Sequence, residues 1–216
     1  MIPAAALKTP RTRGHAAAPI ALLAALALAA CQKSASAVSA DDMTLGNPKA
    51  PVTVIEYASL SCPHCAAFNN DTFPAFRAKY IDTGKINYVF REALTADPAI
   101  AAAGFLTARC AGKDKYFQVI DAVFHVPALH EGAEGDPHAI LLQIAESAGL
   151  SETKFDACIR DPAAQKALND RWQGYVTDDK VDQTPTFVIN GVLHKGVMTL
   201  PQLDQAIASG GGKPST

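Results

Sequence analysis

Several features that mark common functional classes are absent from this sequence of 216 residues. Basic residues are not in excess, because 19 Lys and Arg stand against 21 Asp and Glu, for a formal net charge of −2. A chain without a basic surplus has no electrostatic footprint for nucleic acid. Methionine is scarce, with three residues, and no methionine-rich or histidine-rich tract is present. The 49% of hydrophobic residues is sufficient for a folded core, which excludes a wholly disordered chain.

Long hydrophobic runs are limited to Ala16–Ala30, which has 15 residues and follows the basic residues Lys8, Arg11 and Arg13. This run is shorter than the ~20 apolar residues that cross a bilayer. A cationic start followed by a short apolar stretch is typical of a secretory signal peptide, so we assign this role to residues 1–30. Taking three basic groups from 19 leaves 16 against 21 acids, so the remaining chain carries −5.

The end of this leader, Leu28-Ala29-Ala30-Cys31, resembles the bacterial lipobox, in which the cysteine becomes lipidated and N-terminal. The alternative is cleavage by a general signal peptidase after small residues such as Ala35-Ser36-Ala37. Either cut exports the protein to the periplasm, with or without a lipid anchor on Cys31. Stable disulfides form in that compartment.

The five cysteines are too few for a small disulfide scaffold, and their number is odd. Cys62 and Cys65 form a Cys-x-x-Cys pair that could bind zinc, attach haem or carry a redox disulfide. Zinc normally takes a second Cys or His pair at ligand spacing, which the sequence lacks. Haem attachment requires histidine after the second cysteine, where this chain has Ala66. We therefore expect redox chemistry, with no metal and no cofactor beyond the Cys62–Cys65 disulfide.

Strand-like segments occur near both ends of the exported chain. Pro51–Tyr57 and Ile86–Phe90 are rich in β-branched and aromatic residues, and a helical stretch that begins at Cys62 separates them. Thr186–Ile189 and Val192–Lys195 flank Asn190-Gly191, a strong hairpin signal.

The chain between these two halves has helical character, marked by capping pairs such as Asp97-Pro98 and Asp161-Pro162. The resulting order is β-α-β, a helical insertion, then β-β-α, which predicts an α/β thioredoxin-like fold with an inserted all-helical subdomain. The expected segments are a tether at 31–48, the first thioredoxin-like part at 49–95, the insertion at 96–178, the second part at 179–209 and a disordered tail at 210–216.

The start of the first helix favours a reactive cysteine at position 62. Pro63 suits the first helical position, where its missing N–H has no intrahelical partner. Unsatisfied N–H groups and the positive end of the helix dipole then face the Cys62 sulfur, and a protonated His64 adds a cationic group. A stabilised thiolate stabilises the reduced form, which makes the disulfide a strong oxidant. Cys65, one turn deeper, is expected to be the buried resolving thiol.

At this point the sequence resembles the DsbA family of periplasmic thiol:disulfide oxidoreductases over roughly residues 45–209. Cys62-Pro63-His64-Cys65 is the active-site tetrapeptide of that family, and Asn190-Gly191 follows at the expected distance. The resemblance implies that Glu56 is a buried acid that handles the proton of the second cysteine. It also implies that Thr184-Pro185 forms a cis-proline loop that faces the disulfide.

The resemblance implies a monomeric dithiol oxidase that forms disulfides in exported proteins and is reoxidised by a DsbB-like membrane quinone reductase. The familiar oxidases have valine before the cis-proline, whereas this chain has Thr184. Isomerases and reductases of the superfamily often have threonine at this position. A periplasmic reductase or isomerase is therefore the nearest alternative. A copper-handling or chaperone-type binding module on the same fold is a second alternative.

Cys110 and Cys158 lie on separate predicted helices of the insertion. We expect a structural disulfide between them, a feature that also occurs in a branch of DsbA-like proteins. The alternative is a pair of buried free thiols. With Cys31 lipidated, this bond and the redox pair would account for all five cysteines.

Overall fold

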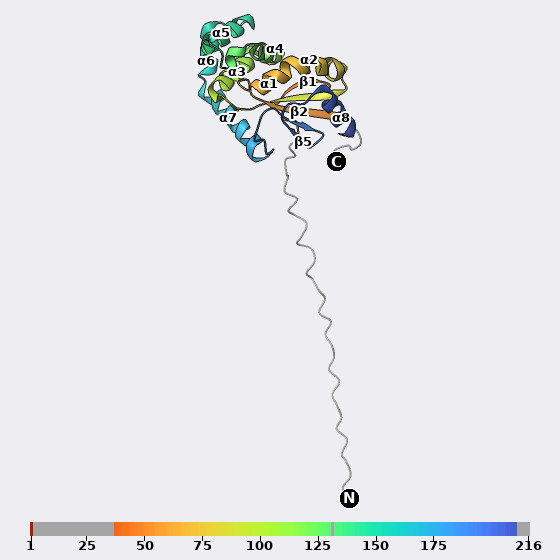
Figure 1. The fold of residues 1–216 in the computed structure, drawn as a ribbon. Coiled ribbons are helices and arrows are strands. Elements are labelled where there is room, and N and C mark those ends of the chain that lie inside the picture. Colours follow the sequence, from red (N-terminus) through yellow and green to blue (C-terminus); the bar gives the residue numbers. More distant parts are fainter. Residues whose placement is uncertain (2–36, 131, 211–216) are drawn as a thin grey trace. The chain divides into compact units, whose positions relative to one another are not determined.

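A five-stranded mixed β-sheet forms the centre of the folded chain (Figure 1). The computed structural model describes residues 1, 37–130 and 132–210. The strand order is β1-β3-β2-β4-β5. The strands are β1 (Met43–Gly46), β2 (Val52–Ala58), β3 (Ile86–Glu92), β4 (Thr186–Ile189) and β5 (Val192–Lys195).

The sheet topology confirms the predicted fold class. Strands β2 and β3 run parallel and are joined by a helical crossover, as in a β-α-β unit. Strand β4 is antiparallel to β2 and forms a hairpin with β5, in which Asn190 and Gly191 both have positive φ. The last element in the described part of the chain is α8 (Leu200–Gly210). This is a thioredoxin-like α/β fold with a helical insertion between its two halves.

The assignment of 31–48 as a tether was wrong for its last part. Strand β1 lies inside that range and pairs antiparallel with β3, with Met43 opposite Phe90. Met43 is buried in the core, whereas its neighbour Thr44 is exposed. Its sequence, Met-Thr-Leu-Gly, has one β-branched residue and adjoins no hairpin signal, so the strand is defined by its pairing with β3 rather than by its own sequence. Residues 2–36, which include the predicted lipidation site Cys31, lie outside the described residues.

The crossover after β2 is a helix with two interruptions. It begins with α1 (Pro63–Ala67), continues through a π-helical turn at Phe68–Thr72 and resumes as α2 (Phe73–Phe76). Pro74 stands in the first turn of α2, where the missing N–H is tolerated, and this explains why the helix restarts after Thr72. A second π-helical turn, Arg77–Ile81, leads to β3.

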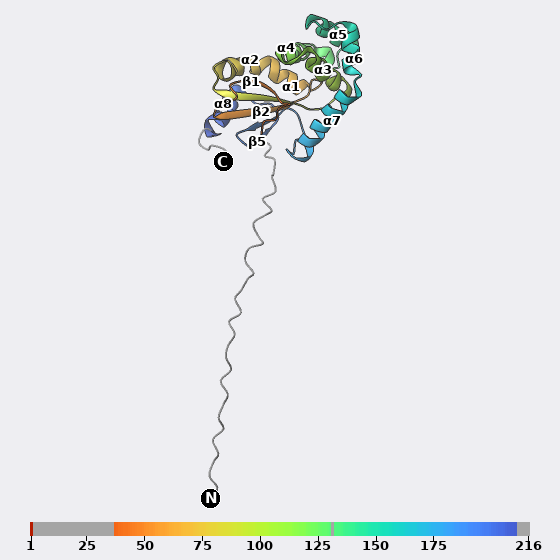
Figure 2. The same ribbon diagram turned by 180° about the vertical axis from the view of Figure 1, so that it is seen from behind.

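The described residues of the insertion form five α-helices and a 3₁₀ turn at one end of the sheet (Figure 2). Asp97, Asp136, Ser151 and Asp161 accept hydrogen bonds from backbone N–H groups at the helix starts, as their capping positions predict. The helices are α3 (Pro98–Ala111), α4 (Lys113–Phe124), α5 (Pro137–Ser147), α6 (Glu152–Ile159) and α7 (Pro162–Thr177), with the 3₁₀ turn at Pro127–Leu129. Among the described helices, none is both long and apolar enough to cross a bilayer.

The two faces of the sheet bury different side chains. Alternate residues of β2 and β3, such as Val54 and Tyr88, join the main core with the crossover helix, α8 and most of the insertion. The intervening residues, such as Ile55 and Val89, pack on the opposite face against aromatic residues of α7. This period of two is the normal alternation of side chains along a strand.

The second face also contains a buried charged cluster around Arg91 of β3, whose side chain is 5% exposed. Arg91 contacts Asp42 at 3.1 Å and Asp179 at 2.9 Å, and it donates to the Tyr57 hydroxyl at 2.7 Å. Its guanidinium also donates to the carbonyl oxygen of Ala37 at 2.7 Å. Because each charge is paired, the cluster fixes the chain before β1 and the loop after α7 against the sheet.

The insertion is attached to the sheet through Glu92, the last residue of β3. Its carboxylate accepts from Arg109 of α3 at 2.6 Å and from Arg171 of α7 at 2.7 Å. A disulfide joins Cys110 of α3 to Cys158 of α6, as the sequence predicts. Helix α3 is thus linked to the end of β3 by an ion pair and to α6 by a covalent bond.

The disulfide allows a prediction about stability. Replacing both cysteines, in Cys110→Ala with Cys158→Ala, removes a cross-link between residues 48 positions apart. We expect the free energy of unfolding in urea to fall by about 4 kcal/mol, because the unlinked unfolded chain regains loop entropy. The reference is the oxidised wild-type protein. The wild-type protein with both of these residues reduced lacks the same cross-link and should show a similar loss. An unchanged denaturation midpoint, or alkylation of both cysteines in the native oxidised protein, would contradict this expectation.

Candidate active site

The Cys-x-x-Cys pair lies where β2 ends and the crossover helix begins. Cys62 is the residue before α1, with an extended backbone at φ −96° and ψ 118°, and Pro63 is the first helical residue. The carbonyl oxygen of Cys62 accepts from the N–H groups of Cys65 and Ala66, both at 3.1 Å. The two cysteines are not joined by a disulfide. Cys62 is 6% exposed and Cys65 is completely buried.

The surroundings of Cys62 favour the thiolate. A hydrogen bond from the Cys65 thiol is the main cause, and it lowers the pKa of Cys62 from 9.0 to about 5 despite partial burial. The Thr184 side chain and the backbone N–H groups of Cys65 and His64 lower this pKa further. In the thiol form, the sulfur lies 3.5 Å from the carbonyl oxygen of Thr184. Donors at the helix start and in the loop that contains Thr184 therefore both stabilise the Cys62 thiolate that the sequence predicts.

Cys65 has the opposite environment. Burial raises the pKa of its thiol well above 9.0, and the hydrogen bond and charge of Cys62 raise it further. A thiolate on Cys65 would lose hydration without gaining comparable partners. The two sulfurs, three residues apart, thus differ strongly in acidity.

Glu56 lies on β2 with its side chain in the main core. Burial raises the pKa of its carboxyl from 4.5 to about 8, although a hydrogen bond from Tyr88 opposes this shift. The Tyr88 hydroxyl donates to Oε2 of Glu56 at 2.6 Å. The charge of an ionised Glu56 raises the pKa of Cys65, so the two groups interact. Glu56 is therefore a buried acid whose charge acts on Cys65, and Tyr88 is its unpredicted hydrogen-bond partner.

The loop before β4 approaches the pair from another part of the chain. The Thr184–Pro185 peptide bond is cis, as the resemblance implies. Pro185 is buried, and Thr184 contacts Cys62 through its carbonyl oxygen. Pro63 and His64 are exposed. The backbone N–H of His64 lowers the pKa of Cys62, and the added effect of a protonated imidazole stays a prediction.

A group of hydroxyl-bearing residues behind the pair was not predicted. Ser59 and Ser61, both buried in the loop before Cys62, donate to the carbonyl oxygen of Thr95 at 3.0 and 2.9 Å. The hydroxyl of Thr95 lies 2.6 Å from that of Thr184. The alternation Ser59-x-Ser61 beside the tetrapeptide was a visible signal in the sequence. Thr95 had no such signal, because its partners are distant along the chain.

The other sequence-predicted residues do not join this site. Cys110 and Cys158 form their disulfide within the insertion, and Cys31 lies outside the described residues. Within residues 37–130 and 132–210, no three His, Cys, Asp or Glu side chains are grouped so that they could hold a metal ion.

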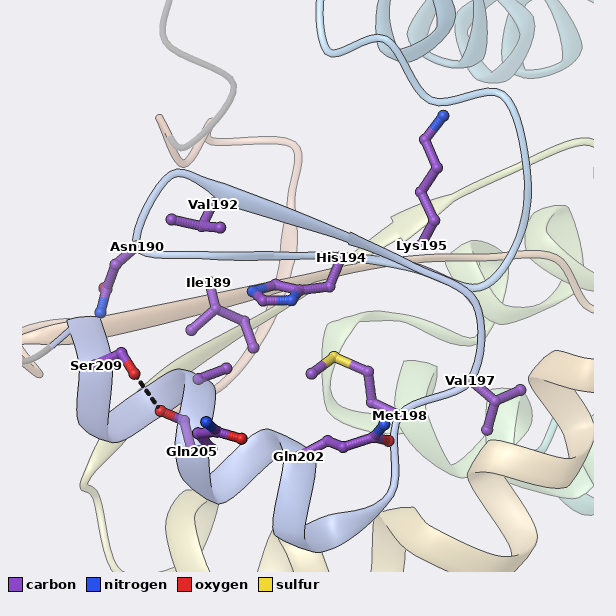
Figure 3. A pocket seen from close by; sticks show the side chains of 11 residues that line it. Ile189, Asn190, Val192, His194, Lys195, Val197, Met198, Gln202, Gln205 and Ser209 are labelled. Carbon is purple, nitrogen blue, oxygen red and sulfur yellow. Dashed lines mark hydrogen bonds between the residues drawn. The ribbon is translucent and has the colours of Figure 1, made fainter.

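A separate cavity of about 900 Å³ lies between the β4–β5 hairpin and α8 (Figure 3). His194 and Met198 line it from the hairpin side, and Gln202 and Gln205 line it from α8. Neither cysteine of the pair belongs to its lining. The cavity combines apolar side chains with polar ones, among them the charged Lys195, and we assign no step of the thiol chemistry to it.

Comparison with known proteins places this geometry in a family. A family profile described as thioredoxin matches residues 38–209. The protein from Rickettsia conorii named "Putative protein-disulfide oxidoreductase" is 32% identical over 155 residues, which are 72% of this chain and 55% of that relative. The chain therefore spans just over half the length of this curated relative.

Solved structures extend the likeness over most of the chain. Wolbachia pipientis alpha-DsbA1 has a TM-score of 0.73 and is 30% identical, and the match covers 82% of this chain and 94% of that protein. BdbD from Bacillus subtilis has a TM-score of 0.67 at 20% identity, covers 80% of this chain and 94% of that one, and shares the fold. The chain belongs to the thioredoxin family and, within it, to the DsbA family of thiol:disulfide oxidoreductases.

Proposed function

We propose that this protein is a dithiol oxidase that transfers the Cys62–Cys65 disulfide to reduced proteins outside the cytoplasm. The observation that carries the proposal is the contrast between the two thiols. A pKa near 5 for Cys62 favours the reduced protein with a thiolate at this position. A protein whose reduced form is stabilised has an oxidising disulfide.

The first step is thiol–disulfide exchange at Cys62. A substrate thiolate attacks the Cys62 sulfur, a bond forms between these sulfurs, and the Cys62–Cys65 bond breaks. The electron pair of the broken bond goes to Cys65. Because burial disfavours a thiolate there, Cys65 takes up a proton. Glu56 is the proposed proton donor, since a pKa of about 8 keeps it protonated near neutral pH.

The second step releases the oxidised substrate. A second substrate thiolate attacks the substrate sulfur of the mixed disulfide and expels Cys62 as a thiolate. The substrate loses two electrons and gains a disulfide, and the protein is left as the dithiol. The low pKa of Cys62 makes it a good leaving group in this step. A DsbB-like membrane quinone reductase is the proposed electron acceptor that restores the Cys62–Cys65 disulfide.

The proposed location is the bacterial periplasm. The cationic and apolar character of residues 1–30 supports export, and the lipobox-like end supports a lipid anchor on Cys31. The Cys110–Cys158 disulfide agrees with an oxidising compartment. We propose that the folded part acts as a monomer on unfolded or reduced exported proteins.

Thr184 supports a second candidate function, a periplasmic disulfide reductase or isomerase. Isomerases and reductases of the superfamily often have threonine at this position, although the stabilisation of the Cys62 thiolate by this side chain favours the oxidase. The reduction potential of the Cys62–Cys65 pair separates the two functions. A value near the ~−270 mV of thioredoxin would support the reductase, whereas a value near the ~−120 mV of DsbA would support the oxidase.

The oxidation of reduced ribonuclease tests the function directly. We expect the purified protein to restore ribonuclease activity in the presence of oxidised glutathione, and Cys62→Ser to abolish this effect. The double variant Cys110→Ala with Cys158→Ala is the matched control, since it removes two cysteines outside the site and should remain active. Full activity of Cys62→Ser would exclude thiol chemistry at this pair and favour a binding module.

The acidity of Cys62 gives a second prediction. In the reduced protein, the thiolate absorbance in the ultraviolet should appear with a midpoint near pH 5. Cys65→Ala should raise this midpoint by about one pH unit or more, because it removes the main donor to a charged sulfur. Cys62→Ala is the control and should lack the transition. A wild-type midpoint near 9 would contradict the proposed stabilisation.

The buried acid gives a third prediction, tested on the oxidised protein so that neither Cys62 nor Cys65 titrates. Above pH 4.5 the unfolded chain loses the Glu56 proton, whereas the folded protein keeps it until about pH 8. The free energy of unfolding should therefore fall as the pH rises through this window, by up to about 1.4 kcal/mol per pH unit.

Glu56→Gln is the matched control for this titration, because its amide can still accept the Tyr88 hydrogen bond but has no proton to lose. The difference in unfolding free energy between wild type and Glu56→Gln, measured in urea across the window, should change with pH. Parallel stability curves would show that Glu56 does not titrate in this range.

A further inference from the structure

Three loops meet beside Cys62, and they are joined by hydroxyl groups. The first precedes Cys62, the second follows β3 and contains Thr95, and the third contains Thr184 before the cis peptide bond. Ser59 and Ser61 connect the first loop to the second through the carbonyl oxygen of Thr95. The side chain of Thr95 connects the second loop to the third. Thr95 therefore contacts both of the other loops, through different atoms.

The second loop has a fixed backbone at this point. The single hydroxyl proton of Ser61 is shared between the carbonyl oxygens of Thr95 and Asp97, both at 2.9 Å, and the same hydroxyl accepts from the Asp97 N–H at 3.1 Å. Between Thr95 and Asp97, Ala96 has φ 59°, in the left-handed region that residues other than glycine rarely adopt. The surrounding hydrogen bonds hold this unfavourable conformation. The backbone next to Thr95 is thus held in place by its contacts with the first loop.

The contact between the two threonines has two possible directions. The oxygen atoms lie 2.6 Å apart, and either hydroxyl could donate. Each hydroxyl has one proton. If Thr184 donates to Thr95, its proton is not available to Cys62. If Thr95 donates to Thr184, the Thr184 proton is free to point toward the Cys62 sulfur, whose thiol lies 3.5 Å from the carbonyl oxygen of the same residue.

We infer that Thr95 is a positioning residue for the redox pair, and that its hydroxyl donates to Thr184 so that Thr184 donates to the Cys62 thiolate. The inference rests on the proposed thiol–disulfide function and deepens it. Thr95 contacts neither sulfur, so it acts through Thr184. When Cys62 is protonated or in a disulfide, the direction of the threonine pair is free to reverse, because no negative charge attracts the Thr184 proton.

The test compares variants that change the hydroxyl of Thr95 and leave its backbone carbonyl in place. Thr95→Val has nearly the same shape but no hydroxyl, whereas Thr95→Ser retains it. The carbonyl contacts of Ser59 and Ser61 are backbone-directed and remain in both. We expect Thr95→Val to raise the Cys62 pKa by about 0.7 units, since the loss of one hydrogen bond is worth about 1 kcal/mol. Thr95→Ser should stay close to wild type.

The same variants should change the redox equilibrium with glutathione. A weaker thiolate destabilises the reduced form, so the disulfide of Thr95→Val should become about 5-fold less oxidising, which corresponds to about 20 mV. A purely structural role would alter the melting temperature without moving these two quantities together. Thr95→Ala provides a second variant without the hydroxyl, should Thr95→Val not fold.

A double-mutant cycle identifies the route. In a Thr184→Val background the Thr184 hydroxyl is absent, so adding Thr95→Val should cause no further change in the Cys62 pKa. Additive shifts, or an unchanged pKa in single Thr95→Val, would overturn the inference. The proposed function fails separately, if the wild-type protein has no low-pKa thiol or does not oxidise reduced ribonuclease.

Discussion

The thiol chemistry of this protein depends on the different surroundings of two sulfur atoms three residues apart. Cys62 precedes the helix and meets N–H and hydroxyl donors, so its pKa falls to about 5. Cys65 lies inside the core, where burial raises the pKa of its thiol. The Cys65 thiol is itself the main donor to Cys62. The asymmetry is therefore cooperative, because a proton held on one sulfur stabilises the negative charge on the other.

This asymmetry requires several parts of the chain to be held in register. The helix start supplies the backbone donors, and the loop before β4 supplies Thr184. That loop and the helix start are 122 residues apart in the sequence. The pairing of β4 with β2 brings them together. The insertion contributes less directly, since Glu92 and the Cys110–Cys158 disulfide fix α3, the helix that follows the loop containing Thr95.

Local patterns in the sequence were sufficient for the fold class, four of the five strands, the capped helices and the Cys-x-x-Cys pair. Each of these features is specified by neighbouring residues: alternation in β2, an Asn-Gly turn, or an aspartate before proline. Strand β1 was missed because it has one β-branched residue and, unlike the equally short β4 and β5, adjoins no hairpin signal. Tyr88 and Thr95 were missed for a different reason. Their roles are defined by contacts 32 and 89 residues away in the chain, which no local pattern encodes.

The two faces of the sheet show why Glu56 suits a role in proton transfer. Tyr57 and Arg91 point to the second face, where Arg91 is paired with two aspartates and remains charged. Glu56 points to the first face, and its hydrogen bond comes from the neutral phenol of Tyr88 rather than from a cation. A phenol stabilises a carboxylate less than a cation does. Burial then dominates, and the carboxyl keeps its proton near neutral pH. A cation at the position of Tyr88 would hold Glu56 ionised, and the proton that Cys65 needs on leaving the disulfide would have to come from another source.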